Sequence, residues 1–550
     1  MKFFRKEYFI YFLLILAAVL LFTNLAGDLL WEDEAETAVI AKNILRFGWP
    51  KAFDGVNLVT QEWGHDSNAQ KIWIHQTWLP HYLTALSFLV FGVSTWAARL
   101  PYVVLALITI WLMYYFIYKE KKQYSLALLA ALFLTTSVTF ILHARQCRYY
   151  SLLIFFAVLW LFLYWRWQNN QKKNVLLLST VGALLFHAQY MSALAWLAST
   201  FLAGYFVQKR KVKNKEHLTI WAGIALLCLP WIIYAQLWDK FGEVGTNLSD
   251  RLINWLINIP LHLFGVNHFI FPVVLFIGIG YLFYKRKIDD FDKYIFLAGV
   301  FYYLIICFIP LYPDIRYIIV LIPWAAYFLA KIVLMLSRKS KTMAGLLVVT
   351  LIFSNIWSLP YWYISKWSLP EKIITHYKDL RFDLMNYFYE LRDSAQGPVK
   401  AAVEYFEQQA SPGQSVFTSY GAEPYIFYTN LKIARELPFK DPAPDWIILK
   451  GNTWQKWMKW VLFQDNLNKQ ASTKKYVWNY KSEKETPVIW GIRKRYIENY
   501  LSKNNYEAVR ISAPDRLWEN RPTLLWHDFG KTAFQKNSLV IYKKPPKQHK

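Results

Sequence analysis

The chain has 550 residues, of which 55% are apolar and 19% are aromatic. Its apolar residues are grouped in runs long enough to cross roughly 30 Å of hydrocarbon, which excludes an ordinary soluble protein. The formal net charge of +25 is spread over many short loops and a long tail, which argues against nucleic-acid binding and favours contact with anionic membrane lipids.

The first apolar run, at about residues 8–27, follows a basic start. It is longer than the core of a signal peptide, so we expect a membrane-spanning helix with a cytoplasmic N-terminus. Short basic loops separate alternate pairs of the runs that follow, and the odd number of spans places the C-terminus outside. The eleven predicted spans are 8–27, 99–118, 125–143, 149–165, 175–190, 192–208, 218–237, 269–284, 294–310, 317–336 and 343–363.

The densest group of carboxylates directly follows the first span, where residues 32–36 read EDEAE. Asp33 and Glu36 have the spacing of a capping box, and Gly48 predicts the end of the helix. The capping box leaves Glu32 and Glu34 unexplained, and a carboxylate near the hydrocarbon boundary is costly unless it is paired. We therefore expect cationic side chains to face this cluster.

Several basic residues lie on the same predicted side of the membrane. Arg99 starts the second span, Arg145 and Arg148 precede the fourth, Arg316 precedes the tenth, and Lys71 lies in the first outer loop. Arginine binds phosphate in a bidentate geometry, so this set suits a phosphate-bearing substrate that meets a carboxylate base. The alternative is that the arginines reach lipid head groups or only pair with the carboxylates. Further candidates for a cavity or an acceptor site are Glu36, His75, His81, Tyr149, His187 and Tyr317.

The residues after the last span predict a folded α/β domain. Residues 414–419, 446–449 and 538–542 read as short buried strands, and 423–429 reads as a helix that begins with proline. We therefore expect a polytopic α-helical membrane protein with about 11 transmembrane helices and a C-terminal soluble α/β domain. The predicted division is 1–363, with a large first outer loop at 28–98, and 364–550.

Two further features leave alternatives open. The cysteines, Cys147, Cys228 and Cys307, lie in or beside the spans, so we expect packing residues and no disulfide framework in the tail. The tail's most distinctive stretch is ENRPTLLWHDF, with Arg521 and His527. Its aromatic residues suit either stacking against a glycan or packing inside the domain.

Four stretches resemble a known family: WEDEAETAVIAKNIL, LTALSFLVFGVSTWAARLP, HARQCRYYSLL and IRYIIVLIP. They are similar to stretches of the membrane glycosyltransferases with the GT-C fold, notably the lipid A aminoarabinose transferases and the protein O-mannosyltransferases. The likeness runs over about residues 10–340. It implies an enzyme of the bacterial inner membrane whose C-terminal domain is periplasmic.

The resemblance implies transfer of a sugar from a polyprenyl phosphate to a lipid, glycan or protein acceptor, with inversion of the anomeric centre. The family's base falls on Asp33, with Glu34 beside it as a second catalytic candidate. The arginines before the fourth and tenth spans and Lys71 would bind the donor phosphate, beneath short helices of the first outer loop that roof a cavity. No cofactor is required because the donor is already activated, and a divalent metal is left open, although no tight metal-ligand spacing appears.

The sequence departs from the family pattern at two places. Relatives often carry a Lys-Pro-Pro or Pro-Pro segment where this chain has Thr77 and Trp78, so no lysine role is carried over to that point. Some relatives have an acidic residue where this chain has Tyr149 and Tyr150, so a second carboxylate there is not predicted. A lipid-linked glycan ligase or polymerase stays open as an alternative, as does a flippase-type transporter, which should carry ionisable residues near mid-span.

Overall fold

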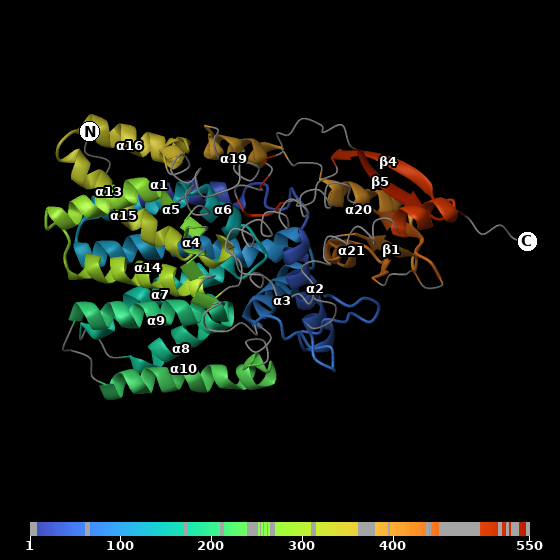
Figure 1. The fold of residues 1–550 in the computed structure, drawn as a ribbon, viewed down its shortest axis with the longest axis horizontal. Coiled ribbons are helices and arrows are strands. Elements are labelled where there is room, and N and C mark those ends of the chain that lie inside the picture. The colour runs from blue at the N-terminus through green and yellow to red at the C-terminus, as the bar shows by residue number, and fades with distance from the viewer. Residues whose placement is uncertain are drawn as a thin grey trace, which may run out of the picture.

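The computed structural model describes residues 8–60, 66–169, 174–208, 214–238, 251–252, 255–256, 258–260, 262–263, 270–309, 315–360, 380–393, 397–419, 421–435, 439, 442–449, 496–514, 520–523, 527, 529 and 538–545. An elongated helical bundle forms one end of the molecule and a sheet with its helices forms the other (Figure 1). Two helices of the first outer loop lie between these two parts. The site described below lies at this junction.

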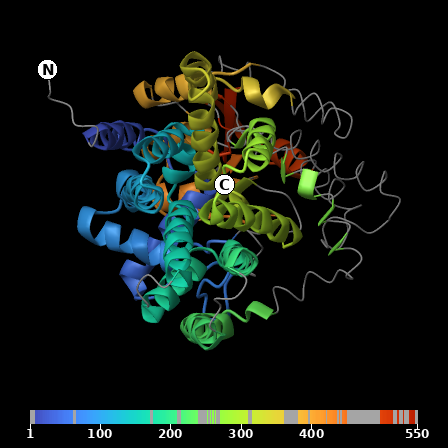
Figure 2. The same cartoon turned by 90° about the vertical axis from the view of Figure 1, so that its left-hand side faces the viewer.

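The bundle contains a helix at each predicted span. Its helices are α1 (Phe9–Phe22), α4 (Thr95–Lys121), α5 (Tyr124–Thr136), α6 (Val138–Ala144), α7 (Tyr150–Gln168), α8 (Val175–Ala188), α9 (Tyr190–Gln208), α10 (Asn214–Tyr234), α13 (Pro272–Tyr284), α14 (Asp290–Phe308), α15 (Leu321–Ser337) and α16 (Lys341–Phe353). Seen from the end opposite the sheet, many of them appear nearly end-on (Figure 2).

The described helices confirm a multi-pass membrane protein. Five of them, α4, α7, α9, α10 and α14, are long and apolar enough to cross a membrane, and a sixth span results if α5 and α6 are joined. The other predicted spans, at α1, α8, α13, α15 and α16, are shorter apolar helices of 10 to 17 residues.

The predicted span 125–143 is broken rather than straight. Helices α5 and α6 meet at Ser137 with a bend of 64°. The Ser137 hydroxyl accepts a hydrogen bond from the backbone N–H of Phe140 at 3.4 Å, which caps α6. The bend matters for the site because α6 ends at Ala144, directly before the two arginines of the HARQCR stretch.

The first outer loop contains α2 (Glu32–Phe47) and α3 (Leu79–Phe91). The predicted capping box of Asp33 and Glu36 is wrong, because α2 begins two residues earlier, with Trp31 as its N-cap. The Oε2 atom of Glu34 accepts from the backbone N–H of Trp31 at 3.4 Å. Carboxylates are favoured in the first turn by the helix dipole, so the helix begins at the first of them. It ends at Gly48, as predicted, in a left-handed conformation with φ of +77°.

Helix α3 exposes an apolar face. Leu86, Leu89 and Val90 are 58%, 70% and 64% exposed, as expected for a helix that lies against a membrane surface. Its other face is buried, with Phe88 and Ala85 in a hydrophobic cluster that also contains residues of α2 and of the C-terminal part of the chain. The first outer loop therefore packs on the C-terminal domain while it offers apolar side chains to lipid.

The C-terminal part is an α/β domain, as predicted. Its sheet has the order β2-β1-β3-β5-β4, with parallel pairing on both sides of β1 and antiparallel pairing on both sides of β5. Strands β1 (Ser415–Thr418), β3 (Trp446–Ile448) and β5 (Ser538–Lys543) were predicted, whereas β2 (Lys432–Ile433) and β4 (Glu507–Pro514) were not. Helices α20 (Pro398–Gln409) and α21 (Glu423–Tyr428) belong to this part, and α21 is the predicted helix. Helix α19 (Asp383–Arg392) lies between the bundle and the sheet (Figure 1).

Candidate active site

Asp33 is buried at the start of α2, between arginines from two distant parts of the chain. Its Oδ2 atom accepts a hydrogen bond from Arg316 Nη1 at 3.2 Å and lies 3.9 Å from Arg148 Nη2. The side chains of Asp33 and Arg316 are 8% and 22% exposed. Arg316 belongs to η2 (Ile315–Tyr317), the short turn before α15. Residues 33, 148 and 316, which the sequence predicts to share an outer site, are therefore in contact.

Arg148 donates several hydrogen bonds to the first turns of α2. It donates to the carbonyl oxygen of Asp33 at 2.9 Å, to the Thr37 hydroxyl at 3.0 Å, and to Oε1 of Glu36. The side chains of Arg148 and Glu36 are 3% and 0% exposed. Complete burial raises the pKa of Glu36 to about 8, against the opposite effect of Arg148. Arg148 thus orients the helix turn that presents Asp33.

Both carboxylate oxygens of Glu34 accept hydrogen bonds from buried donors. Arg99 donates to both of its oxygens, from Nε at 2.8 Å and from Nη2 at 2.7 Å, and the backbone N–H of Cys147 donates at 2.8 Å. Arg99 also donates to the carbonyl oxygens of the loop after α1, at Leu25, Asp28 and Leu29. The cation that Glu34 was expected to face is therefore Arg99, and this buried pair fixes α2 against α4.

Arg145 binds main-chain oxygens at the end of α1. It donates to the carbonyls of Leu20, Leu21, Thr23 and Asn24 at 2.8–3.2 Å. Leu20 and Leu21 lie in the last turn of α1, whose carbonyl groups lack intrahelical donors, and Thr23 and Asn24 directly follow the helix. Such contacts compete with a donor phosphate, so Arg145 suits a helix cap better than a phosphate ligand.

Lys71 and His75 lie in the turns between α2 and α3. Lys71 is exposed, with φ of +58°, in a tight turn closed by its N–H to the carbonyl of Asn68 at 2.9 Å. His75 Nδ1 lies 3.4 Å from Oδ1 of Asp66, and its side chain is 33% exposed.

Of the remaining candidates, His81 and Tyr149 lie near Arg148, whereas Tyr317 and His187 make other contacts. His81 is fully buried, which lowers its pKa to about 3, with a further contribution from Arg148, so its imidazole is neutral. Tyr149 lies under the Arg148 guanidinium at 5.9 Å. The carbonyl of Tyr317 accepts from the Tyr302 hydroxyl, which ties η2 to α14. His187 lies elsewhere, with Nε2 3.3 Å from the carbonyl oxygen of Leu227.

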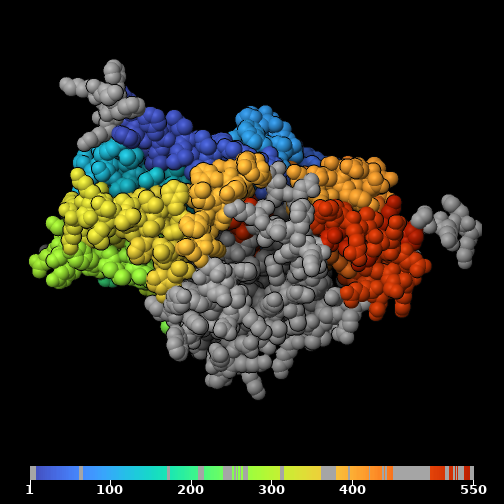
Figure 3. Space-filling view, turned by 90° about the horizontal axis from the view of Figure 1, so that it is seen from above, coloured from blue at the N-terminus to red at the C-terminus, as the bar shows by residue number. Residues whose placement is uncertain are grey.

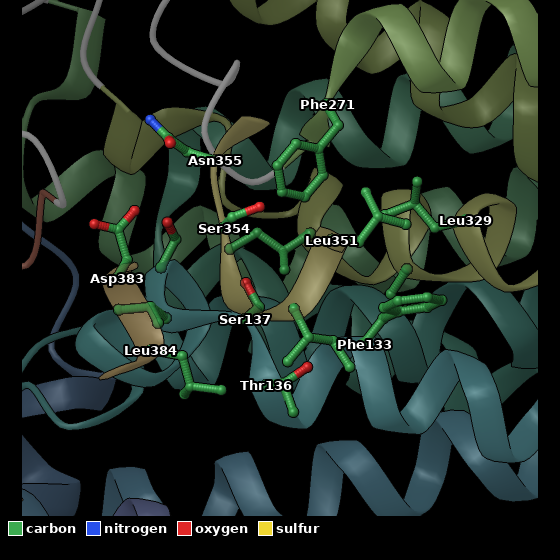
Figure 4. Close-up of a pocket in the computed structure, with 15 residues that line it drawn as sticks. Phe133, Thr136, Ser137, Phe271, Leu329, Leu351, Ser354, Asn355, Asp383 and Leu384 are labelled. Carbon is green, nitrogen blue, oxygen red and sulfur yellow. The ribbon is translucent and has the colours of Figure 1, made fainter. Parts of the chain in front are cut away.

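Asp33 is in direct contact with Arg316, and two cavities among the described residues lie elsewhere. A cavity of about 50 Å³ lies instead where the α5–α6 break meets α15, the end of α16 and the start of α19 (Figure 4). Its lining mixes apolar side chains with six polar residues: Thr136, Ser137, Thr139, Ser354, Asn355 and Asp383. A smaller polar cavity of about 10 Å³ lies beside Arg99 and Arg145. Neither of these two cavities is lined by Asp33, Arg148 or Arg316.

Residues 75–234 match the family model of the dolichyl-phosphate-mannose-protein mannosyltransferases. Two solved structures of ArnT from Cupriavidus metallidurans, one bound to undecaprenyl phosphate and one in the apo state, share 11% and 12% of their residues with this chain, each with a TM-score of 0.55. The similarity covers 82% of this chain and 94% and 95% of the ArnT chains. The chain has a GT-C fold. The predicted resemblance is confirmed, and the family match together with the fold indicates a membrane glycosyltransferase.

No protein of curated function matches the sequence significantly. Among the described residues, no group of three or more His, Cys, Asp and Glu side chains is arranged to hold a metal ion.

Four residues of the site had not been predicted as parts of it. The Trp31 indole donates to Oε1 of Gln146, the Thr37 hydroxyl accepts from Arg148, and Asn520 donates to Glu34 at 3.4 Å. Thr37 follows Asp33 by one helical turn, so helix periodicity could have predicted that it lies on the same face as Asp33. Trp31, Gln146 and Asn520 carry no comparable signal, because their contacts join segments far apart in the chain.

Proposed function

We propose that this glycosyltransferase takes a sugar from a polyprenyl-phosphate donor on the outer side of the membrane and passes it to a hydroxyl acceptor. The observation that carries the proposal is the buried Asp33 carboxylate, held 3.2 Å from Arg316 and 3.9 Å from Arg148. A carboxylate fixed beside a guanidinium that is partly open to solvent combines a proton acceptor with a phosphate ligand.

Arg316 is the phosphate ligand we favour among the three arginines. Arg145 is occupied by carbonyl oxygens, and Arg148 is buried among Glu36, Thr37 and the main chain of α2. The side chain of Arg316 is 22% exposed, compared with 3% for Arg148. A separation of 3.2 Å leaves no room for a phosphate oxygen between Arg316 and Asp33, so donor binding must part these two side chains.

The proposed chemical step gives each of the two groups one role. The acceptor oxygen attacks the anomeric carbon while its proton passes to the Asp33 carboxylate. The bond from the anomeric carbon to the phosphate oxygen breaks, and the polyprenyl phosphate leaves with the bonding electrons, stabilised by Arg316. Because attack and departure occur on opposite faces of the sugar, the configuration inverts. One ArnT structure contains undecaprenyl phosphate, and we infer the same class of leaving lipid here.

The orientation of the site rests on the basic loops. Lys121 ends α4 at the opposite end from Arg99 and lies 2.5 Å from Asp289, which caps α14. Lys339 follows α15 and donates to the Tyr281 hydroxyl at 2.9 Å. Basic side chains thus gather at one end of the bundle and Asp33 lies at the other, which supports a cytoplasmic basic end and an extracytoplasmic site.

Mass spectrometry of lipid and glycan fractions tests the proposal in cells that carry wild-type protein, Asp33→Asn, Asp290→Asn or no copy. We expect one sugar-modified product in wild type and in Asp290→Asn, whose side chain is 69% exposed at the far end of the bundle. The product should be absent with Asp33→Asn. A product extended by a preassembled glycan would favour the ligase or polymerase alternative, and equal products in all four strains would refute the proposal.

A further inference from the structure

A buried ion pair joins the C-terminal domain to α19. His527 Nε2 lies 2.6 Å from Oε2 of Glu390, and His527 Nδ1 lies 2.8 Å from the carbonyl oxygen of Arg521. The side chains of His527 and Glu390 are 1% and 8% exposed. A carboxylate and a carbonyl can only accept, so both ring nitrogens donate and the ring is an imidazolium. The contact of His527, in the stretch singled out in the sequence, is therefore with other parts of the same chain.

The same segment reaches the first turn of α2. Asn520 Nδ2 donates to Oε2 of Glu34 at 3.4 Å, and the Asn520 carbonyl accepts from Gln146 Nε2 at 3.3 Å. Gln146 in turn accepts from the indole of Trp31, the N-cap of α2. Red atoms beside the orange α19, apart from the red strands of the sheet, mark this part of the chain (Figure 3).

Helix α19 is itself fixed to the end of α1. The Tyr387 hydroxyl donates to the carbonyl of Leu20 at 2.5 Å, and Asn24 Nδ2 donates to the carbonyl of Glu390 at 3.0 Å. The Arg145 guanidinium lies 5.7 Å from the centre of the Tyr387 ring. His527 therefore binds α19, which is fixed to the membrane bundle, while Asn520 contacts α2.

We propose that Asn520 and His527 form a clasp, closed by the His527–Glu390 ion pair, that positions Glu34 and the first turn of α2 for sugar transfer. His527 and Glu390 act through Asn520 and Glu34, so they are positioning residues. Their importance for sugar transfer rests on the proposed function. The contacts that close the clasp do not depend on that function.

The charges around His527 give the clasp a pH dependence. Burial works to lower the pKa of His527, but the carboxylates of Glu390 and Asp28 outweigh it and the pKa is raised. A raised histidine pKa gives stabilisation that is complete below the unfolded value of about 6.5 and is lost as pH rises through the folded value. The charged groups that face this region are Glu390 and Asp383 on α19, Asp28 after α1, Arg99 on α4, Arg145 after α6, and Arg521.

Hydrogen–deuterium exchange of the full-length protein, corrected for intrinsic exchange rates, tests the clasp at the amides of residues 35–38. In wild type we expect protection of these amides to fall at least about tenfold between pH 6.5 and pH 9. His527→Gln should lower protection at pH 6.5 and remove the pH dependence. Glu407→Gln, an exposed change on α20, should behave as wild type.

Glu390→Gln serves as the second variant, because its amide still accepts a hydrogen bond and keeps the fold. It should weaken the pH dependence without abolishing protection. Unchanged protection at residues 35–38 in both His527→Gln and Glu390→Gln would overturn the clasp. If protection changes as expected while cells show no sugar-modified product, the clasp stands and the proposed function fails.

Discussion

At the scale of single residues, Asp33 and Glu34 are neighbours in the chain but face different surroundings. Successive residues of a helix point about 100° apart. Glu34 therefore accepts hydrogen bonds from Arg99, Cys147 and Asn520. Asp33 instead faces the more exposed Arg316. A carboxylate whose oxygens are already bound by several donors is a poor proton acceptor, so the geometry favours Asp33 as the base and Glu34 as its support.

The Glu34–Arg99 pair provides a stability prediction. Glu34→Ala leaves the Arg99 guanidinium buried without its carboxylate, and breaking a buried pair in this way costs about 3–5 kcal/mol. Unfolding of the detergent-solubilised protein should show this loss. The double variant Glu34→Leu with Arg99→Met should recover much of it, because neither charge remains. Equal stability of Glu34→Ala and wild type would contradict the importance of the pair.

Glu36 predicts a pH dependence of stability. Its pKa is raised to about 8 by burial, so the folded protein keeps a proton that the unfolded chain releases near pH 4.5. Stability should therefore fall as pH rises from about 5 to 8. Glu36→Gln keeps an acceptor for Arg148 but cannot titrate, so its stability should change less over this range. Parallel curves for the two proteins would contradict the assignment.

At the scale of elements, a second buried network ties three helices together far from Asp33. Asp292 in the first turn of α14 accepts from Lys121 of α4 at 2.8 Å and from Lys331 and Tyr327 of α15. Its carboxylate is fully buried. Lys121 and Asp292 lie at helix ends, whereas Tyr327 and Lys331 lie near the middle of α15.

Asp292 can be compared with Asp290 on the same helix. Asp292→Ala removes the shared acceptor and leaves two lysines beside each other, so we expect thermal stability to fall by an amount typical of a broken buried pair, about 3–5 kcal/mol. Asp290→Ala should change it by less than about 0.5 kcal/mol, because exposed positions contribute little. Similar melting temperatures for both variants would show that the network does not stabilise the bundle.

Helices and strands were predicted well where a local run of apolar residues indicates them. All eleven apolar runs contain helices, and the runs at β1, β3 and β5 form strands. The break at Ser137 was missed because an apolar run carries no sign of a bend, and β4, with the mixed sequence EAVRISAP, lacks a buried-strand pattern. Within the site, the contact of Asp33 with Arg316 followed from expected topology, but the cap formed by Arg145 depends on main-chain geometry that residue types do not encode.

At the scale of the whole molecule, the first outer loop and the C-terminal domain form a joint structure. The backbone N–H of Leu30 donates to the Tyr428 hydroxyl at 2.9 Å. Asn57 donates to the carbonyl of Leu431 and accepts from the N–H of Ile433, at 3.0 and 2.8 Å. The rings of Phe88 and Phe427 lie 6.1 Å apart. The proposed division at 363/364 thus separates segments that share one core.

Expression of residues 1–363 alone tests this interdependence. Removing the C-terminal part exposes the apolar side of α2 and α3 that covers Ile426 and Phe427, so the fragment should elute as aggregates or be degraded. Size-exclusion chromatography in detergent provides the measurement, with the full chain as control. A monodisperse fragment with full helical content would contradict the shared core.

The most direct measurement of the central claim compares Asp33→Asn with wild type in two assays on the same purified protein: binding of undecaprenyl phosphate, and turnover of the sugar donor once mass spectrometry has identified its sugar. If Asp33 is the base, lipid binding stays within a few-fold of wild type while turnover falls at least about a hundredfold. Turnover equal to wild type, with the protein folded and lipid-bound, would remove Asp33 from the reaction.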